Sequence, residues 1–118
     1  MSYVDGFVLP VPKKKLKAYT ALSKKAGKVW KEYGALDYRE CVGDDLNIKG
    51  MKSSFPKLLK LKPGETVVFA WILYKSKSQR DRINAKVMKD PRLAAMGNEM
   101  PFDIKRMIYG GFKAFVEL

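Results

Sequence analysis

The most informative pattern in this chain is an almost unbroken apolar run from Thr66 to Tyr74. A β-strand points successive side chains to opposite faces of its sheet. The odd positions of this run and its even positions therefore form two separate faces, and both are apolar. A second run, Met107 to Val116, is nearly as apolar. Strands of this kind need cover on both sides of the sheet.

Alternation and helical spacing predict the remaining elements. Residues 3–11 alternate as a strand that places Asp5 on one face with apolar neighbours, and Pro10 and Pro12 are expected to end it. Residues 13–33 have apolar positions three, four and seven apart, which is typical of a helix with one buried face. That face contains Leu16, Tyr19, Leu22, Ala26, Val29, Trp30 and Tyr33.

The remaining elements, from residue 35 onward, are again strands and helices in alternation with connecting loops. A strand at 35–42 precedes a long connection, 44–65, in which we expect a short extra strand near 54–61. After the run at 66–74, a second helix is expected to begin at Ser76 or Ser78, and Ser78 with Asp81 fits a capping box. Asp90 and Pro91 predict a short helix that Gly97 ends. A loop over 98–105 then leads to a last strand at 106–116.

The resulting order is β-α-β-β-α-β, which is an α+β, ferredoxin-like arrangement in a single domain spanning residues 1–118. Two good helices can cover one face of such a sheet and leave the other face bare. The simplest cover for the bare face is the same face of a second copy. The sequence therefore predicts a homodimer, a dimeric α+β barrel with its two sheets packed face to face.

Composition excludes several kinds of chemistry. The chain has no histidine and one cysteine, Cys41, which removes Ser-His and Cys-His catalytic pairs and most zinc, copper and iron sites. We therefore expect no metal and no cofactor. We interpret Cys41 as a small buried hydrophobe. No segment reaches the roughly 20 apolar residues of a membrane span, and no secretory signal is visible, so a cytoplasmic location without membrane contact is expected.

Several strings resemble the YbaA-like family of small uncharacterised bacterial proteins. They are Tyr3-Val4-Asp5-Gly6-Phe7-Val8, Gly43-Asp44-Asp45, Ser54-Phe55-Pro56, Asp90-Pro91-Arg92, Met100-Pro101-Phe102-Asp103 and Lys105-Arg106-Met107-Ile108-Tyr109-Gly110-Gly111-Phe112. The resemblance spans nearly the whole chain and implies a dimeric α+β barrel without an established reaction. Some members carry a label that links them to signal-recognition-particle RNA, although these strings match no RNA-reading module.

The barrel architecture suggests a cavity between sheet and helices that holds a small apolar or aromatic ligand, and relatives of the fold oxidise such ligands as cofactor-independent monooxygenases. Candidate polar groups are Asp5 as a base with Arg106 and Tyr109. The alternative for Asp5 is a dimer contact or a structural ion pair with Arg39, Arg80 or Arg106. An equally simple interpretation of the apolar candidates is a packed core and dimer seam. Those candidates are Phe69, Trp71, Met88, Phe102 and Met107.

A formal net charge of +12 raises a second possibility, which is non-specific nucleic-acid or other polyanion binding. Lysines follow the helix face opposite the apolar one, where no aromatic side chain is available to stack on bases. A solvated lysine face is the simpler explanation of them, and a purely structural dimer is the third possibility. The lysines concerned are Lys17, Lys24, Lys25, Lys28 and Lys31.

Overall fold

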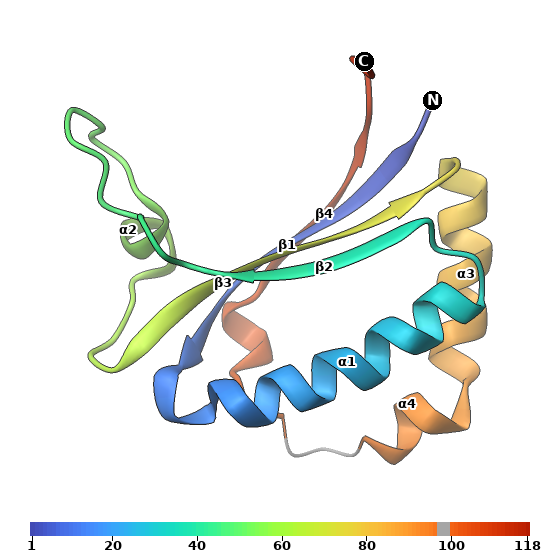
Figure 1. Cartoon of the computed structure of the whole chain (residues 1–118), viewed down its shortest axis with the longest axis horizontal. Coiled ribbons are helices and arrows are strands. Elements are labelled where there is room, and N and C mark those ends of the chain that lie inside the picture. Colours follow the sequence, from blue (N-terminus) through green and yellow to red (C-terminus); the bar gives the residue numbers. More distant parts are fainter. Residues whose placement is uncertain (97–99) are drawn as a thin grey trace.

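The apolar runs form the strands of one antiparallel sheet in the computed structural model, which describes residues 1–96 and 100–118. Figure 1 shows this sheet with its helices on one side. The order across the sheet is β2-β3-β1-β4, so the first strand of the chain lies in the interior. The strands are β1 (Tyr3–Pro12), β2 (Asp37–Val42), β3 (Glu65–Tyr74) and β4 (Ile108–Lys113).

Three helices, α1, α3 and α4, cover one face of the sheet, and the short α2 sits apart from them (Figure 1). The expected β-α-β-β-α-β order and ferredoxin-like class are confirmed. Two single 3₁₀ turns complete the described elements. The helices are α1 (Leu16–Glu32), α2 (Phe55–Leu59), α3 (Lys77–Lys89) and α4 (Pro91–Ala95), and the turns are Lys13–Lys15 and Ile104–Arg106.

The core lies between this helical layer and the sheet. Val11, Tyr74 and Val87 have no exposed surface, and they come from a central strand, its neighbour and α3. The even positions of β3 face the helices, as their near-complete burial shows. Burial of large apolar side chains, worth about 1.5–3 kcal/mol each, is the main term that holds these layers together.

The opposite face of the sheet is largely bare. Phe69, Ile108 and Phe112 are 43%, 44% and 62% exposed there, and the register places the glycines Gly6 and Gly110 between them. This face, called the open face below, also carries Cys41. Cys41 is exposed, so its interpretation as a small buried hydrophobe is wrong. The alternation of the run at 66–74 predicted the two apolar faces of the sheet. The helices of a single chain cover one of these faces and leave the open face uncovered.

The prolines of β1 do not end the strand. Pro10 pairs with Val67 and the strand continues to Pro12. β4 accompanies β1 only as far as Val8, so both prolines lie where β1 has a free edge that needs no N–H donor.

Two further expectations are corrected. Residues 54–61 form a helical turn instead of a strand, because Ser54 accepts a hydrogen bond from the Lys57 amide and Pro56 starts the turn. Of the two predicted caps of the second long helix, Ser76 is confirmed, because its hydroxyl accepts a hydrogen bond from the Gln79 amide, and the Ser78 alternative is wrong. Asp90 caps α4 as expected, whereas its predicted end at Gly97 lies outside the described residues.

Candidate functional site

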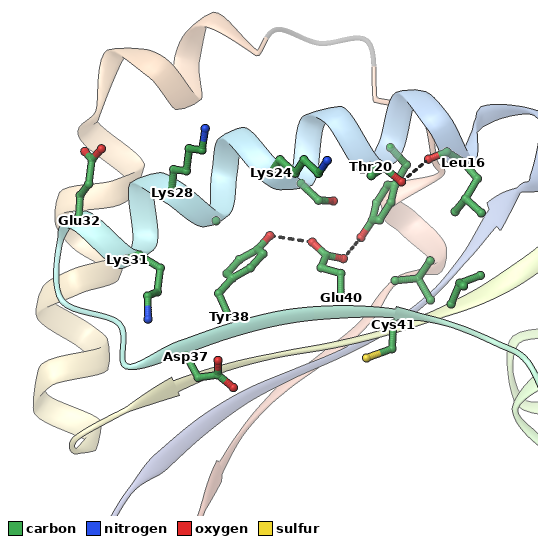
Figure 2. A pocket seen from close by; sticks show the side chains of 15 residues that line it. Leu16, Thr20, Lys24, Lys28, Lys31, Glu32, Asp37, Tyr38, Glu40 and Cys41 are labelled. Atoms are coloured by element: carbon green, nitrogen blue, oxygen red, sulfur yellow. Dashed lines mark hydrogen bonds between the residues drawn. The ribbon is translucent and has the colours of Figure 1, made fainter.

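A groove of about 680 Å³ runs between α1 and β2, along the edge of the sheet. A smaller cavity of about 180 Å³ lies behind it, between the sheet and the helical layer. Tyr19, Ser23, Tyr38 and Glu40 line both spaces and therefore form the wall between them. Figure 2 shows Tyr38 and Glu40 of this wall between the helix and the strand.

Glu40 is the central polar group of this wall. One of its carboxylate oxygens accepts a hydrogen bond from the Tyr19 hydroxyl, and the other accepts one from the Tyr38 hydroxyl at 2.7 Å. Tyr19 comes from α1, and Tyr38 and Glu40 come from β2 and point toward the helix (Figure 2). A carboxylate has about four acceptor positions, so two remain for a ligand.

The local sequence explains this placement. Tyr38 and Glu40 are two residues apart in β2 and so point to the same face, toward α1. Gly27 on α1 lets the Tyr38 ring approach the helix, since a Cβ at Gly27 would lie 2.7 Å from that ring. Trp30, one turn further along the helix, packs against the same ring with 6.1 Å between centroids.

Burial and the neighbouring carboxylate raise the pKa values of Tyr19 and Tyr38 well above the usual range of a tyrosine. Both are therefore neutral hydrogen-bond donors at every physiological pH. Desolvation is the larger cause for each, because a phenolate would be charged in an environment with little water. The pair holds the carboxylate of Glu40 in one orientation as an acceptor.

Lysines line the groove on the α1 side. Lys31 donates from its Nζ to the Leu36 carbonyl at 2.8 Å, and Glu32 pairs with Arg92 at 2.7 Å. Lys24 and Lys28 also line the groove, and within the described part of the chain neither forms an ion pair. These two side chains are thus available to an anionic group of a ligand.

The part of the inner cavity that the described residues line is apolar apart from the wall. Of the residues predicted to line a ligand cavity, Phe102 and Met107 border it, and so does Trp71, although Trp71 lies at an odd position of β3, whose side chains belong to the open face. Phe69 lies on the open face, where its ring contacts those of Phe55 and Trp71. Met88 is 64% exposed on α3. The other apolar residues of the lining include Phe7, Leu9, Leu22, Ala26, Trp30, Ala70, Ile72 and Leu93.

The predicted base, Asp5, lies elsewhere, in a buried cluster between β1, β4 and α3. It is 1% exposed and accepts hydrogen bonds from Tyr74 at 2.9 Å, Tyr109 at 3.0 Å and Arg80 at 3.1 Å. Asn84 completes the set at 3.3 Å. Every acceptor site of this carboxylate is occupied, which is the arrangement of a structural ion pair.

Arg106 does not join that cluster. Its guanidinium donates to both carboxylate oxygens of Glu65, at 2.6 and 2.9 Å, and to the carbonyls of Leu59 and Lys60. The arginine beside Asp5 is Arg80, and Arg106 is placed at the other end of the sheet because β4 begins just after it. Arg106 thus ties the start of β3 to the segment that follows α2.

No group of three histidine, cysteine, aspartate or glutamate side chains that could hold a metal ion occurs within residues 1–96 and 100–118. Across the same residues, no helix has the length and apolar character needed to cross a bilayer.

The comparisons with known proteins agree with the resemblance seen in the sequence. Residues 2–104 match the family described as "Protein of unknown function (DUF1428)". The chain belongs to this family. It is also 47% identical over 117 residues to "Uncharacterized protein YbaA" from Escherichia coli strain K12 and from Shigella flexneri, and each match covers 99% of both chains.

Solved structures with the same fold are distant in sequence. A dimeric ferredoxin-like protein from an uncultured marine organism covers 100% of both chains with a TM-score of 0.57 at 11% identity. A NIPSNAP domain protein from Burkholderia xenovorans covers 98% of both chains with a TM-score of 0.51 at 12% identity. At these identities the similarity shows the fold alone.

Glu40, Tyr19 and Tyr38 were visible in the sequence as separate residues but were not predicted to form a site. The available signal was a carboxylate at an even position of a short strand, on the face that also carries Tyr38. A charged group on a face that is to be buried needs partners. Which helix residue would meet it depends on the packing of α1 on the sheet, which spacing alone does not show.

Proposed function

We propose that this protein binds a small hydroxylated aromatic anion between α1 and β2. The observation that carries this proposal is Glu40, a carboxylate held by two tyrosines in the wall between a groove and an apolar cavity. Ligand sites are typically apolar spaces with a few fixed polar groups. Glu40 provides such a group, and among residues 1–96 and 100–118 it is the one charged side chain of the inner lining.

Each part of the ligand follows from one part of the site. The inner cavity, at about 180 Å³, accommodates a single substituted ring among apolar side chains. A hydroxyl on that ring would donate to Glu40, as the two tyrosine hydroxyls already do. An anionic substituent would lie in the groove near Lys24 and Lys28. Oxidation of this ligand, as in a cofactor-independent monooxygenase, stays a prediction that the binding proposal does not need.

The same proposal includes a homodimer formed through the open face. Large apolar side chains stay exposed on this face, and the described charged pair there, Asp37 with Arg39 at 3.1 Å, is neutral as a whole. Homodimer interfaces are apolar and poor in unpaired charge. The marine ferredoxin-like protein is itself described as dimeric, which supports the same association for this chain.

Titration of ¹⁵N-labelled protein with 4-hydroxybenzoate tests the binding site. We expect amide shifts at residues that border the wall, namely Gly27, Tyr38 and Glu40, with a dissociation constant in the millimolar range or tighter. Glu40→Gln keeps the side-chain shape and leaves one phenol without its acceptor, so it should weaken this binding. Shifts confined to the exposed side of α1, or no shifts at millimolar ligand, would contradict the proposal.

Polyanion binding is the second candidate, and one observation favours it. All eight lysines between Lys13 and Lys31 are exposed. Such a surface binds nucleic acid through released counterions, so its affinity should fall steeply with salt and ignore base sequence. Three of these lysines line the groove. The lysine face that remains on the outside of α1 is therefore smaller than the sequence indicated.

A further inference from the structure

Residues 43–64, called the arm below, leave the sheet between β2 and β3 and project from it. Figure 1 shows the arm on the side of the sheet away from α1, α3 and α4. Its base is anchored where Phe55 meets Phe69 of the open face with 6.2 Å between ring centroids. Further out, Ile48, Met51 and Leu58 are 51%, 66% and 60% exposed. An arm of this kind exposes apolar surface that its own chain does not cover.

A second uncovered apolar segment follows β4. Residues 114–118, called the tail below, include Phe115 at 85% and Val116 at 64% exposure. The tail is held in place, because the Ala114 amide donates to the Ser2 carbonyl at 3.0 Å and the Ser2 amide donates to Glu117 at 2.6 Å. It is therefore an ordered feature with bare apolar side chains.

The arm and the tail lie at opposite ends of the sheet. The register pairs Tyr3 of β1 with Lys113, next to the tail, and Pro12 with Glu65, next to the arm. Ten strand residues separate these ends, about 30 Å at the usual rise per residue. Figure 1 likewise shows the two features far apart, both on the side of the open face. Within one chain they do not meet.

We infer that the arm of one copy packs against the tail of a second copy in the homodimer. This inference rests on the homodimer proposed above and names its outer contacts. A two-fold axis between two stacked sheets either follows the strands, which brings arm against arm, or runs across them, which brings each arm to the partner's tail. The first arrangement also brings tail against tail, so both arrangements place the two apolar segments against a second copy.

Charge selects the arrangement in which each arm meets the partner's tail. The arm carries five lysines, Lys49, Lys52, Lys57, Lys60 and Lys62, against two acidic residues, Asp44 and Asp45. Two such arms placed against one another would repel. The tail instead offers Glu117, whose carboxylate lies at the same end of the sheet. Complementary charge at the rim of an interface favours one orientation over another.

The open side of the molecule is also large enough. The Cα atoms extend over 39 × 37 × 20 Å, and the view down the shortest axis shows the sheet edge-on, so the open side is bounded by the 39 Å and 20 Å dimensions (Figure 1). That area is close to the roughly 800 Å² that each partner buries in a stable complex. The open face would supply the centre of the interface, and the arm and tail would supply its two ends.

Disulfide trapping tests this contact. In a Cys41→Ser background, a chain with both Met51→Cys and Phe115→Cys should form a covalent dimer in a glutathione redox buffer, with a peptide linking positions 51 and 115. A disulfide needs Cα atoms within about 7 Å, so the same link cannot form inside one chain. Chains with either new cysteine alone are the controls and should stay uncrosslinked.

Each other outcome overturns the inference. A covalent dimer from Met51→Cys alone would show arm against arm. A dimer in sedimentation equilibrium without the 51–115 link would leave the homodimer intact and remove only the arm–tail contact. A monomer would remove both, while titration of the same sample with 4-hydroxybenzoate would report on the ligand site independently.

A matched pair of substitutions provides a second readout. Met51→Ser, on the arm, should weaken dimerisation several-fold in sedimentation equilibrium. Met88→Ser, on the outer side of α3, is the same change at nearly the same exposure, 64% against 66%, and should leave dimerisation unchanged. Equal effects of the two variants would contradict a contact made by the arm.

Discussion

At the scale of single residues, two carboxylates define this protein, and their surroundings differ. Asp5 is buried and has a hydrogen-bond donor at each of its acceptor positions. Glu40 accepts from two donors and borders both the groove and the inner cavity. Sequence reasoning left Asp5, which shares a strand face with apolar residues, open between a base and a structural ion pair or dimer contact. The structure shows that this burial is fully compensated by partners, so Asp5 holds the fold together and Glu40 is the better candidate for binding.

The Asp5 cluster predicts a large stability difference between two ion pairs. Asp5→Ala leaves the Arg80 guanidinium, whose side chain is 15% exposed, without its buried partner, and this should cost about 3–5 kcal/mol. Arg39→Ala breaks the Asp37 pair, whose arginine is 64% exposed, and should cost about 1 kcal/mol or less. Urea unfolding of both variants checks this, and similar losses would contradict the structural role of Asp5.

The raised pKa values of Tyr19, Tyr38 and Tyr74 predict a loss of stability in alkali. In the unfolded chain these tyrosines lose their protons near pH 10, whereas in the folded chain they keep them. Their contribution to stability is therefore complete below about pH 10 and falls as the pH rises further.

Urea midpoints measured at neutral pH and above pH 10 test this sign. The double variant Tyr19→Phe/Tyr38→Phe lacks two of the three groups but retains every lysine, so its midpoint should fall less over the same range. An identical fall in both proteins would mean that other groups cause the alkaline loss.

At the scale of elements, the site depends on how closely α1 approaches β2. Periodicity predicted both elements to within a few residues, since a three-to-four spacing and an alternation are strong signals. It did not predict that Ser23 and Gly27, two small residues, lie buried on the helix face that meets the strand. Their size lets the Tyr38 ring enter, which is a property of the packed pair and not of either pattern alone.

We therefore expect Gly27→Ala to destabilise the protein, although replacing glycine by alanine inside a helix usually stabilises it. Alanine in a helix normally gains about 1 kcal/mol over glycine, but here the new Cβ would lie 2.7 Å from the Tyr38 ring. We expect a net loss of about 1–3 kcal/mol, as for other overpacked sites, together with weaker 4-hydroxybenzoate binding. Thermal or urea unfolding measures the first effect.

The paired background for this change is Tyr38→Ala, in which the ring is absent. There, Gly27→Ala should stabilise the protein, because only the helix propensity remains. Destabilisation of similar size in both backgrounds would show that the glycine is required for another reason.

At the scale of the whole molecule, the sequence predicted the class of fold and an uncovered sheet face, but the site itself only in part. The two apolar faces of the run at 66–74 were sufficient to predict that one chain leaves one face bare, and Phe69 and Phe112 confirm that exposure. The helix in the arm was missed, because a single capped turn such as Phe55–Leu59 is too short for a periodic pattern. The sequence also predicted only part of the role of the lysines. Their spacing placed them on one helix face, but it could not show which of them border a groove.

The most direct test of the account uses those lysines in two matched pairs. Lys24→Ala/Lys28→Ala and Lys17→Ala/Lys25→Ala remove equal charge from the same helix, but only the first pair lines the groove. We predict that the dissociation constant for 4-hydroxybenzoate rises about tenfold, or about 1.4 kcal/mol, in the first double variant and stays unchanged in the second. Equal weakening in both variants, or none in the first, would contradict a small-molecule site between α1 and β2.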